Sequence, residues 1–359
     1  MQSSPQASKE TTVIFWCGNE SYSVRDLVDA AFFRGEVKPA WEEMLLLLAV
    51  EKQAVELELE IDESAVEAAA EKFRYEHDLI TAEETEQWLE ARGLTLDEFS
   101  DYFGRHFWGS ALKGKDVAEE VDYLAAAADL RELLIAELIF SGELDRMGKR
   151  LGWRVAASRE ANGRNVEREL MLSEEQRFCE RVGIKETEST DVLSRLGRDQ
   201  TWFEEMLRME FLFRSTRDHL VTPAARQREF RSLRLPLTQF AVEIIELESQ
   251  DAAREALLCV RSDGLAMAEV AQEGRYPYRR ANILLEDLPE DSQQRFLSVS
   301  PGSVLDPIQR GDGFQLWRVL EKKAPNPEDP AVRERIDQRI VERHFSELCA
   351  RHIRWRFVT

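Results

Sequence analysis

One stretch near the end of the chain, residues 235–323, most constrains the fold, because strand-forming runs alternate there with helical ones. Residues 240–247 form an unbroken run of mostly bulky and β-branched side chains, which is typical of a buried strand. Apolar residues then recur at helical spacing over 251–260, 265–272 and 290–297. The stretch therefore begins as a strand followed by three helices.

The same stretch ends in strands. A Pro301-Gly302 turn leads into a short strand at 304–308, and a polar turn at 309–313 separates it from a last strand at 314–320. Strand, helices, turn and strand pair together predict a small α+β domain.

The order of these elements, with PGSVLDPI before GFQLWRVLEKKAP, resembles the parvulin domain of peptidyl-prolyl isomerases as found in periplasmic chaperones of the SurA and PpiC type. The match is specific over residues 296–323, whereas the first strand and helix match in pattern only. The resemblance implies a parvulin-type fold for residues 235–323 and an activity on proline peptides.

The side chains that this activity needs in the parvulin family are absent. Active parvulins carry one histidine in the first strand and one in the last, and the matching positions are on or next to Glu243 and at Gln315. No histidine lies between His219 and His344. Rotating an amide past its barrier of about 18–20 kcal/mol requires a pocket that favours the twisted state. We therefore expect this domain to hold peptide without isomerising it; the alternative is a working isomerase that uses Glu243 or Gln315.

Other motif positions of the family also differ. Its third active-site residue, a Cys or Asp, has no counterpart because Cys259 lies in a predicted helix, and its Gly-Gly-x-Leu-Gly turn falls on residues 280–284. The positions of the family's proline pocket are still mostly apolar, so we expect a peptide groove there. The peptide-contacting positions implied by the resemblance are Glu243, Leu284, Leu288, Ser292, Leu297 and Gln315.

From residue 39 to residue 108 the pattern is helical, and capping signals divide it. A long helix is expected at 42–61, a second at 64–77 after Asp62, and two more behind the capping boxes that begin at Thr81 and Thr95. Four helices in this order, with Gly-Leu-Thr-x-Asp-x-Phe at the start of the last, resemble the N-terminal domain of SurA-type chaperones.

An internal repeat extends this mostly helical part of the chain. Residues 89–99 align without a gap with residues 193–203, with glycines and helix caps in register. We therefore expect two related helical units, at 12–113 and 129–222. Chance similarity between short amphipathic helices is the alternative.

The remaining helical segments connect these units to the α+β domain. We expect one helix over 130–151, a middle helix capped by residues 173–176, and a loop at 162–165 that the first unit lacks. Residues 224–234 form a basic connector. Residues 329–359 form a last helix and strand, and in the SurA family the helix after the isomerase domain returns to the N-terminal domain.

Both chain ends carry short patterns. Residues 1–11 have the composition of a disordered lead. Residues 12–16 resemble a strand, and a second short strand runs into a helix capped by Ser23. The first strand needs a partner, which we expect at 354–358 because the alternation there is also strand-like.

Aromatic residues recur at helical spacing in both helical units. Core packing explains most residues of this kind, and a minority would line a cleft for an extended apolar peptide. The candidates are Tyr102, Phe103, Phe107, Trp108, Trp202 and Phe211.

Charge limits the partners of the chain. Its 359 residues suit two or three domains, and its formal net charge is −21 with a pI near 4.9. Nucleic acids and anionic membranes bind basic surfaces, so neither is expected as a partner. A basic or neutral peptide would be attracted, although acidic surfaces also serve solubility.

No targeting, metal or cofactor motif stands out. The N-terminus has no apolar signal core and the aliphatic run 45–50 is too short to span a membrane, so we expect a cytoplasmic protein, with a removed signal peptide as the alternative. The distant Cys17, Cys179, Cys259 and Cys349 are expected to be reduced. The five histidines lack ligand spacing, so no metal or other cofactor is expected.

These features predict a mostly helical α+β chaperone of the SurA-like kind, with a duplicated helical domain and a degenerate parvulin domain. Similar signal-less proteins accompany peptide-maturation or export systems, so the resemblance implies a precursor peptide or unfolded segment as the client. The alternative is a scaffold subunit of a peptide-modifying or export complex, and a homodimer remains open.

Overall fold

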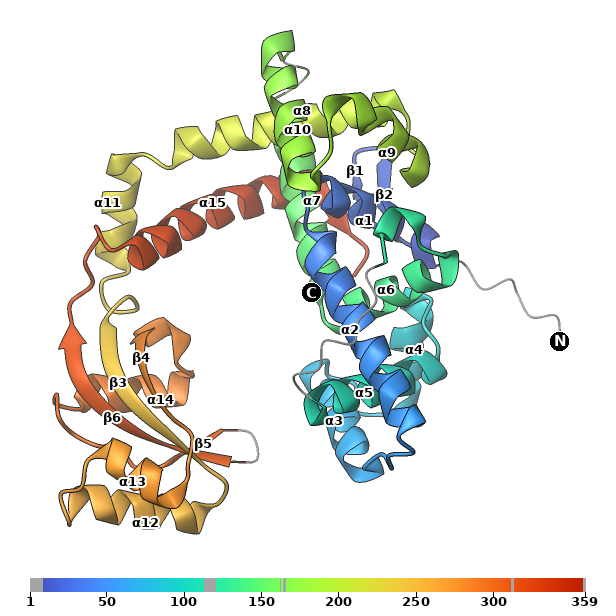
Figure 1. The fold of residues 1–359 in the computed structure, drawn as a ribbon. Helices are drawn as coiled ribbons and strands as arrows, with labels where there is room; N and C mark the ends of the chain where they lie inside the picture. Colours follow the sequence, from blue (N-terminus) through green and yellow to red (C-terminus); the bar gives the residue numbers. More distant parts are fainter. Residues whose placement is uncertain (1–8, 113–120, 162, 164–165, 311–312, 358–359) are drawn as a thin grey trace. The chain divides into compact units, whose positions relative to one another are not determined.

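The computed structural model describes residues 9–112, 121–161, 163, 166–310 and 313–357. The chain divides into two compact units, residues 1–217 with 344–359 and residues 218–343. We call the first the helical unit and the second the sheet unit, and we describe each by itself (Figure 1).

The helical unit contains a three-stranded antiparallel sheet that joins the two ends of the chain. Strand β1 (Val13–Cys17) pairs with β2 (Glu20–Ser23) on one side and with β7 (Ile353–Trp355) on the other. The expected pairing of the chain ends is thereby confirmed, although β7 is shorter than the strand expected at 354–358, of which Val358 lies outside the described residues. Part of the expected disordered lead is ordered, since Lys9–Thr11 form a short 3-10 helix, η1; residues 1–8 lie outside the described residues.

The first five α-helices of this unit are α1 (Val24–Phe33), α2 (Val37–Glu56), α3 (Glu63–Glu76), α4 (Ala82–Arg92) and α5 (Leu96–Ala111). Four of them, α1, α3, α4 and α5, begin at an expected capping residue, whereas α2 has no side-chain cap. Ser23, Thr81 and Thr95 all form capping boxes. Helix α2 is shifted toward the N-terminus relative to its prediction. It ends early because Glu58 has a φ of 52° and the Leu59 N–H donates back to the Ala54 carbonyl.

The rest of the helical unit is also built from helices. They are η2 (Tyr123–Ala125), α6 (Ala128–Phe140), α7 (Glu143–Glu160), α8 (Arg168–Val182), η3 (Glu186–Glu188), α9 (Ser189–Leu196) and α10 (Gln200–Leu220). The single helix expected over 130–151 is wrong, because Gly142 has a φ of 70° and separates α6 from α7. The cap expected at 173–176 is also wrong, since Ser173 lies inside α8 and donates to the Glu169 carbonyl. Of the loop at 162–165, residues Asn162, Arg164 and Asn165 lie outside the described part.

The aligned repeat segments have the same local geometry. Helices α4 and α9 both end at a left-handed glycine, Gly93 with a φ of 70° and Gly197 with a φ of 67°. A capping side chain then begins the next helix: Thr95 accepts from the Glu98 N–H, and Asp199 accepts from the Trp202 N–H at 2.8 Å. The duplication of whole units remains a prediction.

The sheet unit is built on a four-stranded antiparallel sheet of order β4-β3-β6-β5 (Figure 1). Its strands are β3 (Gln239–Leu247), β4 (Tyr278–Leu284), β5 (Ile308–Arg310) and β6 (Gly313–Lys323). Between them lie α12 (Gln250–Arg261), α13 (Met267–Gly274), η4 (Leu285–Asp287) and α14 (Glu290–Ser298). The expected first strand, three helices and final strand pair are present, but the sequence analysis missed β4, which lies between α13 and α14 and pairs with β3. The chain is a mostly helical α+β protein.

Side chains on the two faces of this sheet pack against different helices. Val242 and Ile244 of β3 join a buried cluster with Phe296 of α14, whereas Ile245 and Leu247 join a cluster formed with α12 and α13. Alternation along the strand sends neighbouring residues to opposite faces. Both faces are therefore covered, which explains why β3 is an unbroken apolar run.

Three details of the sheet unit differ from expectation. Residues 280–284, on which the family's turn falls, belong to β4. The strand expected at 304–308 is a single bridge at Val304 followed by β5, and residues 311–312 of the next turn are outside the described part. The expected connector 224–234 is mostly helical, because α11 (Pro223–Ser232) covers most of it, and Phe230 of this helix contacts the buried cluster to which α15 (Pro330–His352) contributes.

Within the described ranges no helix is both long and apolar enough to cross a bilayer.

Candidate functional site

The two positions that match the parvulin histidines lie on opposite faces of the sheet. Glu243 shares a face of β3 with Ile245 and Leu247. Gln315 of β6 pairs in register with Glu246, on the face that carries Ile244 and Trp317, and its amide lies 3.4 Å from the Glu246 carboxylate. These two side chains cannot act on the same peptide bond.

Glu243 is also engaged within its own face of the sheet. It is only 5% exposed, and its carboxylate accepts hydrogen bonds from the Tyr278 hydroxyl at 2.7 Å and from Arg280 at 2.9 Å. Burial and the bond to Glu243 raise the pKa of Tyr278, so this hydroxyl stays a donor. The arrangement ties β4 to β3 and leaves little of the carboxylate accessible.

The expected proline pocket is only partly assembled. Leu288, Ser292 and Leu297 lie on the α14 side of the sheet with Gln315, but Leu288 is 5% and Ser292 only 1% exposed, so both belong to the core. Leu284 lies elsewhere, in the buried cluster with residues of α15.

The aromatic candidates divide into core and half-buried residues. Tyr102, Phe103 and Trp108 are buried, and Tyr102 packs against Phe140 with ring centroids 4.9 Å apart. The half-buried rings are Phe107, Trp202 and Phe211. Core packing therefore accounts for half of the set.

The helical unit contains a groove that the sequence did not reveal. Its cavity volume is about 830 Å³, and it is lined by the α1–α2 junction, by residues 121–124 and by the α8–α9 region. Most of its surface is apolar, with contributions from Leu45, Val182, Ile184 and Val192. We call it the α2–α8 groove.

Three rings build one wall of the α2–α8 groove. Tyr123 stacks on Phe32 with centroids 5.5 Å apart and meets Trp41 edge-on at 5.4 Å. The Trp41 indole N–H donates to the Val121 carbonyl at 2.7 Å, so η2 is held against α1 and α2. Rings fixed in this way present a rigid apolar surface at low entropic cost.

Charged residues at the groove are mostly paired. Arg195 lies 2.8 Å from the Asp122 carboxylate and Lys38 lies 3.7 Å from that of Glu42. Arg181 has no carboxylate at salt-bridge distance among the described residues; its guanidinium lies over the Phe33 ring at 5.6 Å.

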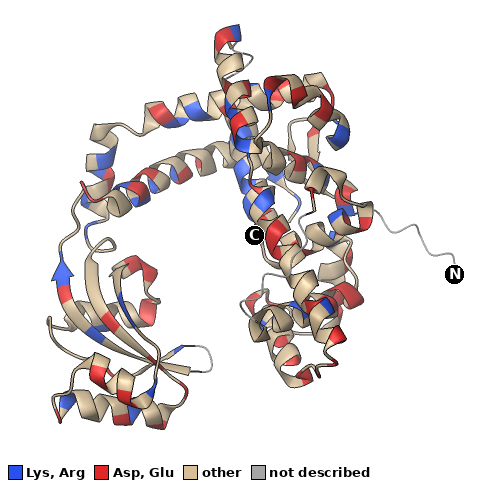
Figure 2. Ribbon diagram, viewed as in Figure 1, with Lys and Arg blue, Asp and Glu red and all other residues tan. Residues whose placement is uncertain are grey.

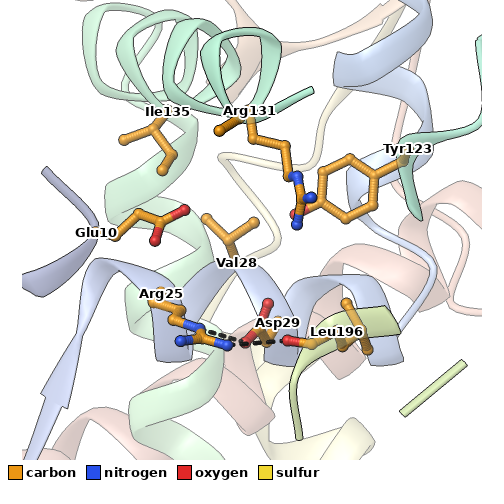
Figure 3. Close-up of a pocket in the computed structure, with 9 residues that line it drawn as sticks. Glu10, Arg25, Val28, Asp29, Tyr123, Arg131, Ile135 and Leu196 are labelled. Atoms are coloured by element: carbon orange, nitrogen blue, oxygen red, sulfur yellow. Dashed lines mark hydrogen bonds and ion pairs between the residues drawn. The ribbon is translucent and has the colours of Figure 1, made fainter. Parts of the chain in front are cut away.

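A smaller polar pocket of about 240 Å³ also uses Tyr123 as a wall (Figure 3). Arg25 donates to the Leu196 carbonyl at 3.0 Å and lies 3.6 Å from Asp29. Burial raises the pKa of Asp29, although Arg198 and Arg25 oppose the shift, and burial also raises the pKa of Tyr123. The described residues that line this pocket include two carboxylates and two guanidiniums, whose charges balance.

Sequence reasoning missed Phe32, Trp41 and Tyr123 as site residues. Trp41 stands in an apolar helix, where a core role is the default, and Tyr123 follows a gap in the helical pattern. The one sequence signal that could have marked Tyr123 as a site residue is that an aromatic residue stands in a short polar segment. In the described part of the chain, no cluster of three or more His, Cys, Asp or Glu side chains is placed to hold a metal.

No known family model matches this sequence, and no curated protein does. Solved structures do match. A peptidylprolyl isomerase, PrsA, from Bacillus cereus is 15% identical over 59% of this chain and 84% of its own, with a TM-score of 0.37. PrsA from Bacillus anthracis is 14% identical over 57% and 94%, with a TM-score of 0.34.

A third match is a Campylobacter jejuni structure described under the heading of two SurA-like chaperones, PEB4 and Cj1289. It is 10% identical over 61% of this chain and 88% of its own, with a TM-score of 0.22. These solved structures are named as PrsA and as SurA-like chaperones.

Proposed function

We propose that this protein is a peptide-binding chaperone related to peptidyl-prolyl isomerases, and that the α2–α8 groove holds an apolar segment of the client. The observation that carries the proposal is the groove itself. Its volume of about 830 Å³ falls in the range of ligand-binding clefts, and its wall of Phe32, Tyr123 and Trp41 is preformed. Several neighbouring apolar residues can bury an extended peptide without any chemistry.

The sheet unit supports binding without isomerisation. Its only histidine is His219, far from the sheet in sequence, and Glu243 and Gln315 face opposite sides. A twisted amide would thus meet no convergent pair of polar side chains at these positions.

The biological setting follows from the sequence resemblance. The client is a precursor peptide or an unfolded segment, held in the cytoplasm for maturation or export, and a peptide-modifying or export complex is the partner. A non-catalytic scaffold of such a complex is the competing function, and a homodimer is compatible with either.

The experiment compares two adjacent residues of α2. Leu45 lines the groove, whereas Leu46 is 41% exposed and lies outside it. A fluorescein-labelled, acetylated and amidated peptide with a Leu-Phe-Leu core should bind the full chain, and Leu45→Glu should weaken binding about tenfold or more, because an unpaired charge would be buried. Anisotropy titration measures both.

Leu46→Glu is the matched control and should leave the dissociation constant within about twofold, since it changes charge without entering the groove. Circular dichroism checks that both variants fold. Equal losses in the two variants, or no binding by the unmodified chain, would refute the groove as the client site.

A further inference from the structure

We infer that the α2–α8 groove selects apolar clients that carry a carboxylate beside their apolar residues, and that Arg181 is the residue that selects them. The inference rests on the proposed function and adds the chemical class of its client. It opposes the expectation from net charge, which favours basic peptides.

The first step is the charge balance inside the groove. Among the residues that the structure describes, its cations are Lys38, Arg181 and Arg195, and its anions are Glu42 and Asp122. Two ion pairs, Lys38 with Glu42 and Arg195 with Asp122, neutralise four of these five groups. Arg181 is the group left over among the described lining residues, so their summed charge is positive although the chain carries −21 overall.

The second step is the placement of Arg181. It occupies the last turn of α8, which ends at Gly183, and its side chain lies along the α1–α2 junction. Arg181 lies directly against the backbone of Gly35 at this junction, since a Cβ built on Gly35, which has a φ of 72°, would be 3.8 Å from the Arg181 Cβ. The guanidinium lies over the face of Phe33 while the residue remains exposed, so its N–H donors are open to a ligand.

The third step is the chemistry of the guanidinium group. Its planar fork of donors matches a carboxylate in a bidentate geometry, and ring stacking fixes the fork at little entropic cost. An apolar client segment in the groove would bring its own carboxylate to this fork and exclude part of the water. The pair should then be worth about 1 kcal/mol, or roughly fivefold in affinity, at the upper end for exposed ion pairs.

Acidic and basic residues are interspersed along the helices of the helical unit (Figure 2). A nearby cation can therefore serve as a control for general surface charge. Lys185 follows α8 and is exposed, and it does not line the groove although Ile184 beside it does.

The test uses the full chain and three acetylated, amidated peptides that share a Leu-Phe-Leu core and differ at one flanking position, Asp, Asn or Lys. The unmodified protein should bind the Asp peptide about three- to fivefold more tightly than the Asn peptide and the Lys peptide most weakly. Arg181→Gln should remove the difference, and Arg181→Glu should reverse the order. A fourth peptide, with Asn and a free C-terminus, shows whether a terminal carboxylate serves as well as a side chain.

Lys185→Glu should keep the order of the three peptides. The inference is overturned if the unmodified chain binds Asp, Asn and Lys peptides equally, or if Lys185→Glu reverses the order as Arg181→Glu does. Equal binding leaves the groove as the client site, whereas failure of every peptide to bind removes the proposed function as well.

Discussion

At the scale of single residues, arginine–carboxylate pairs join helices of the helical unit. Glu36, between α1 and α2, accepts two hydrogen bonds from Arg34, both at 2.9 Å, in a bidentate pair. Arg150 of α7 lies 3.5 Å from the same carboxylate. Glu36 therefore links the α1–α2 turn to α7.

This pairing predicts a pH dependence. Burial alone would raise the pKa of Glu36, but the hydrogen bonds from Arg34 and the charges of Arg34 and Arg150 outweigh it and lower the pKa below its ordinary value of 4.5. A lowered folded-state pKa stabilises the fold above pH 4.5, and that contribution is lost as the pH falls through the folded-state pKa.

Glu36→Gln should therefore lower the free energy of unfolding at pH 7 by about 1 kcal/mol and by less at pH 4. Urea titrations at the two pH values measure the change. Glu60→Gln, in the exposed loop after α2, is the control and should be neutral at both. If Glu36→Gln destabilises the protein as much at pH 4 as at pH 7, the lowered pKa of Glu36 does not contribute to stability and the prediction is wrong.

Residue-scale signals were also the most predictable part of the chain. The boxes at Ser23, Thr81 and Thr95 form as expected because donor and acceptor are three residues apart. Ser173 has the same residue pattern but lies inside α8, because the residues before it continue the helix. A local pattern cannot report where its helix begins.

At the scale of elements, β7 shows how a short strand is held. The Trp355 side chain stands opposite Phe15, with ring centroids 5.1 Å apart, and lies against α7 where that helix carries Gly148 and Gly152. A Cβ at Gly152 would lie 3.0 Å from the indole Cη2. Glycine in this helix interior is therefore explained by the close approach of a ring.

A double-mutant cycle tests this contact. Gly152→Ala should destabilise the protein by about 1–2 kcal/mol in the unmodified chain, because crowding by the ring exceeds the gain in helix propensity. In the Trp355→Ala background the same substitution should stabilise by about 0.5–1 kcal/mol, since only the propensity gain remains.

Urea unfolding followed by circular dichroism gives all four free energies. The control background is Arg354→Ala, because Arg354 is exposed on β7; the destabilisation caused by Gly152→Ala should be unchanged in it. Gly163→Ala would not serve as a control substitution, because Gly163 has a φ of 75°. The same sign for Gly152→Ala in both backgrounds would exclude the ring contact as the reason for glycine.

At the scale of the whole molecule, each compact unit has its own core, and two helices continue from one into the other. The division falls within α10, between Arg217 and Asp218, and within α15, between Arg343 and His344. The chain thus enters the sheet unit along one helix and leaves it along another, and β7 then returns it to the N-terminal strand.

The full chain should leave the cis–trans isomerisation of a proline tetrapeptide at its uncatalysed rate, within about twofold, because no pair of polar groups converges at the parvulin positions. A protease-coupled assay measures the rate, with an active parvulin as the positive control. A rate that grows with protein concentration and disappears in Gln315→Ala would support the isomerase alternative instead.

The sequence alone was sufficient for the helix caps at Ser23, Thr81 and Thr95, for the pairing of the chain ends, and for the strands and α-helices between residues 239 and 323 except β4. Each of these depends on neighbouring residues or on a strong alternation pattern. The face on which Glu243 lies, the break at Gly142 and the assembly of Phe32, Trp41, Tyr123 and Arg181 into one groove required the tertiary structure. Those features depend on strand register and on contacts between segments far apart in the chain, and a period of two or of 3.6 residues does not encode such contacts.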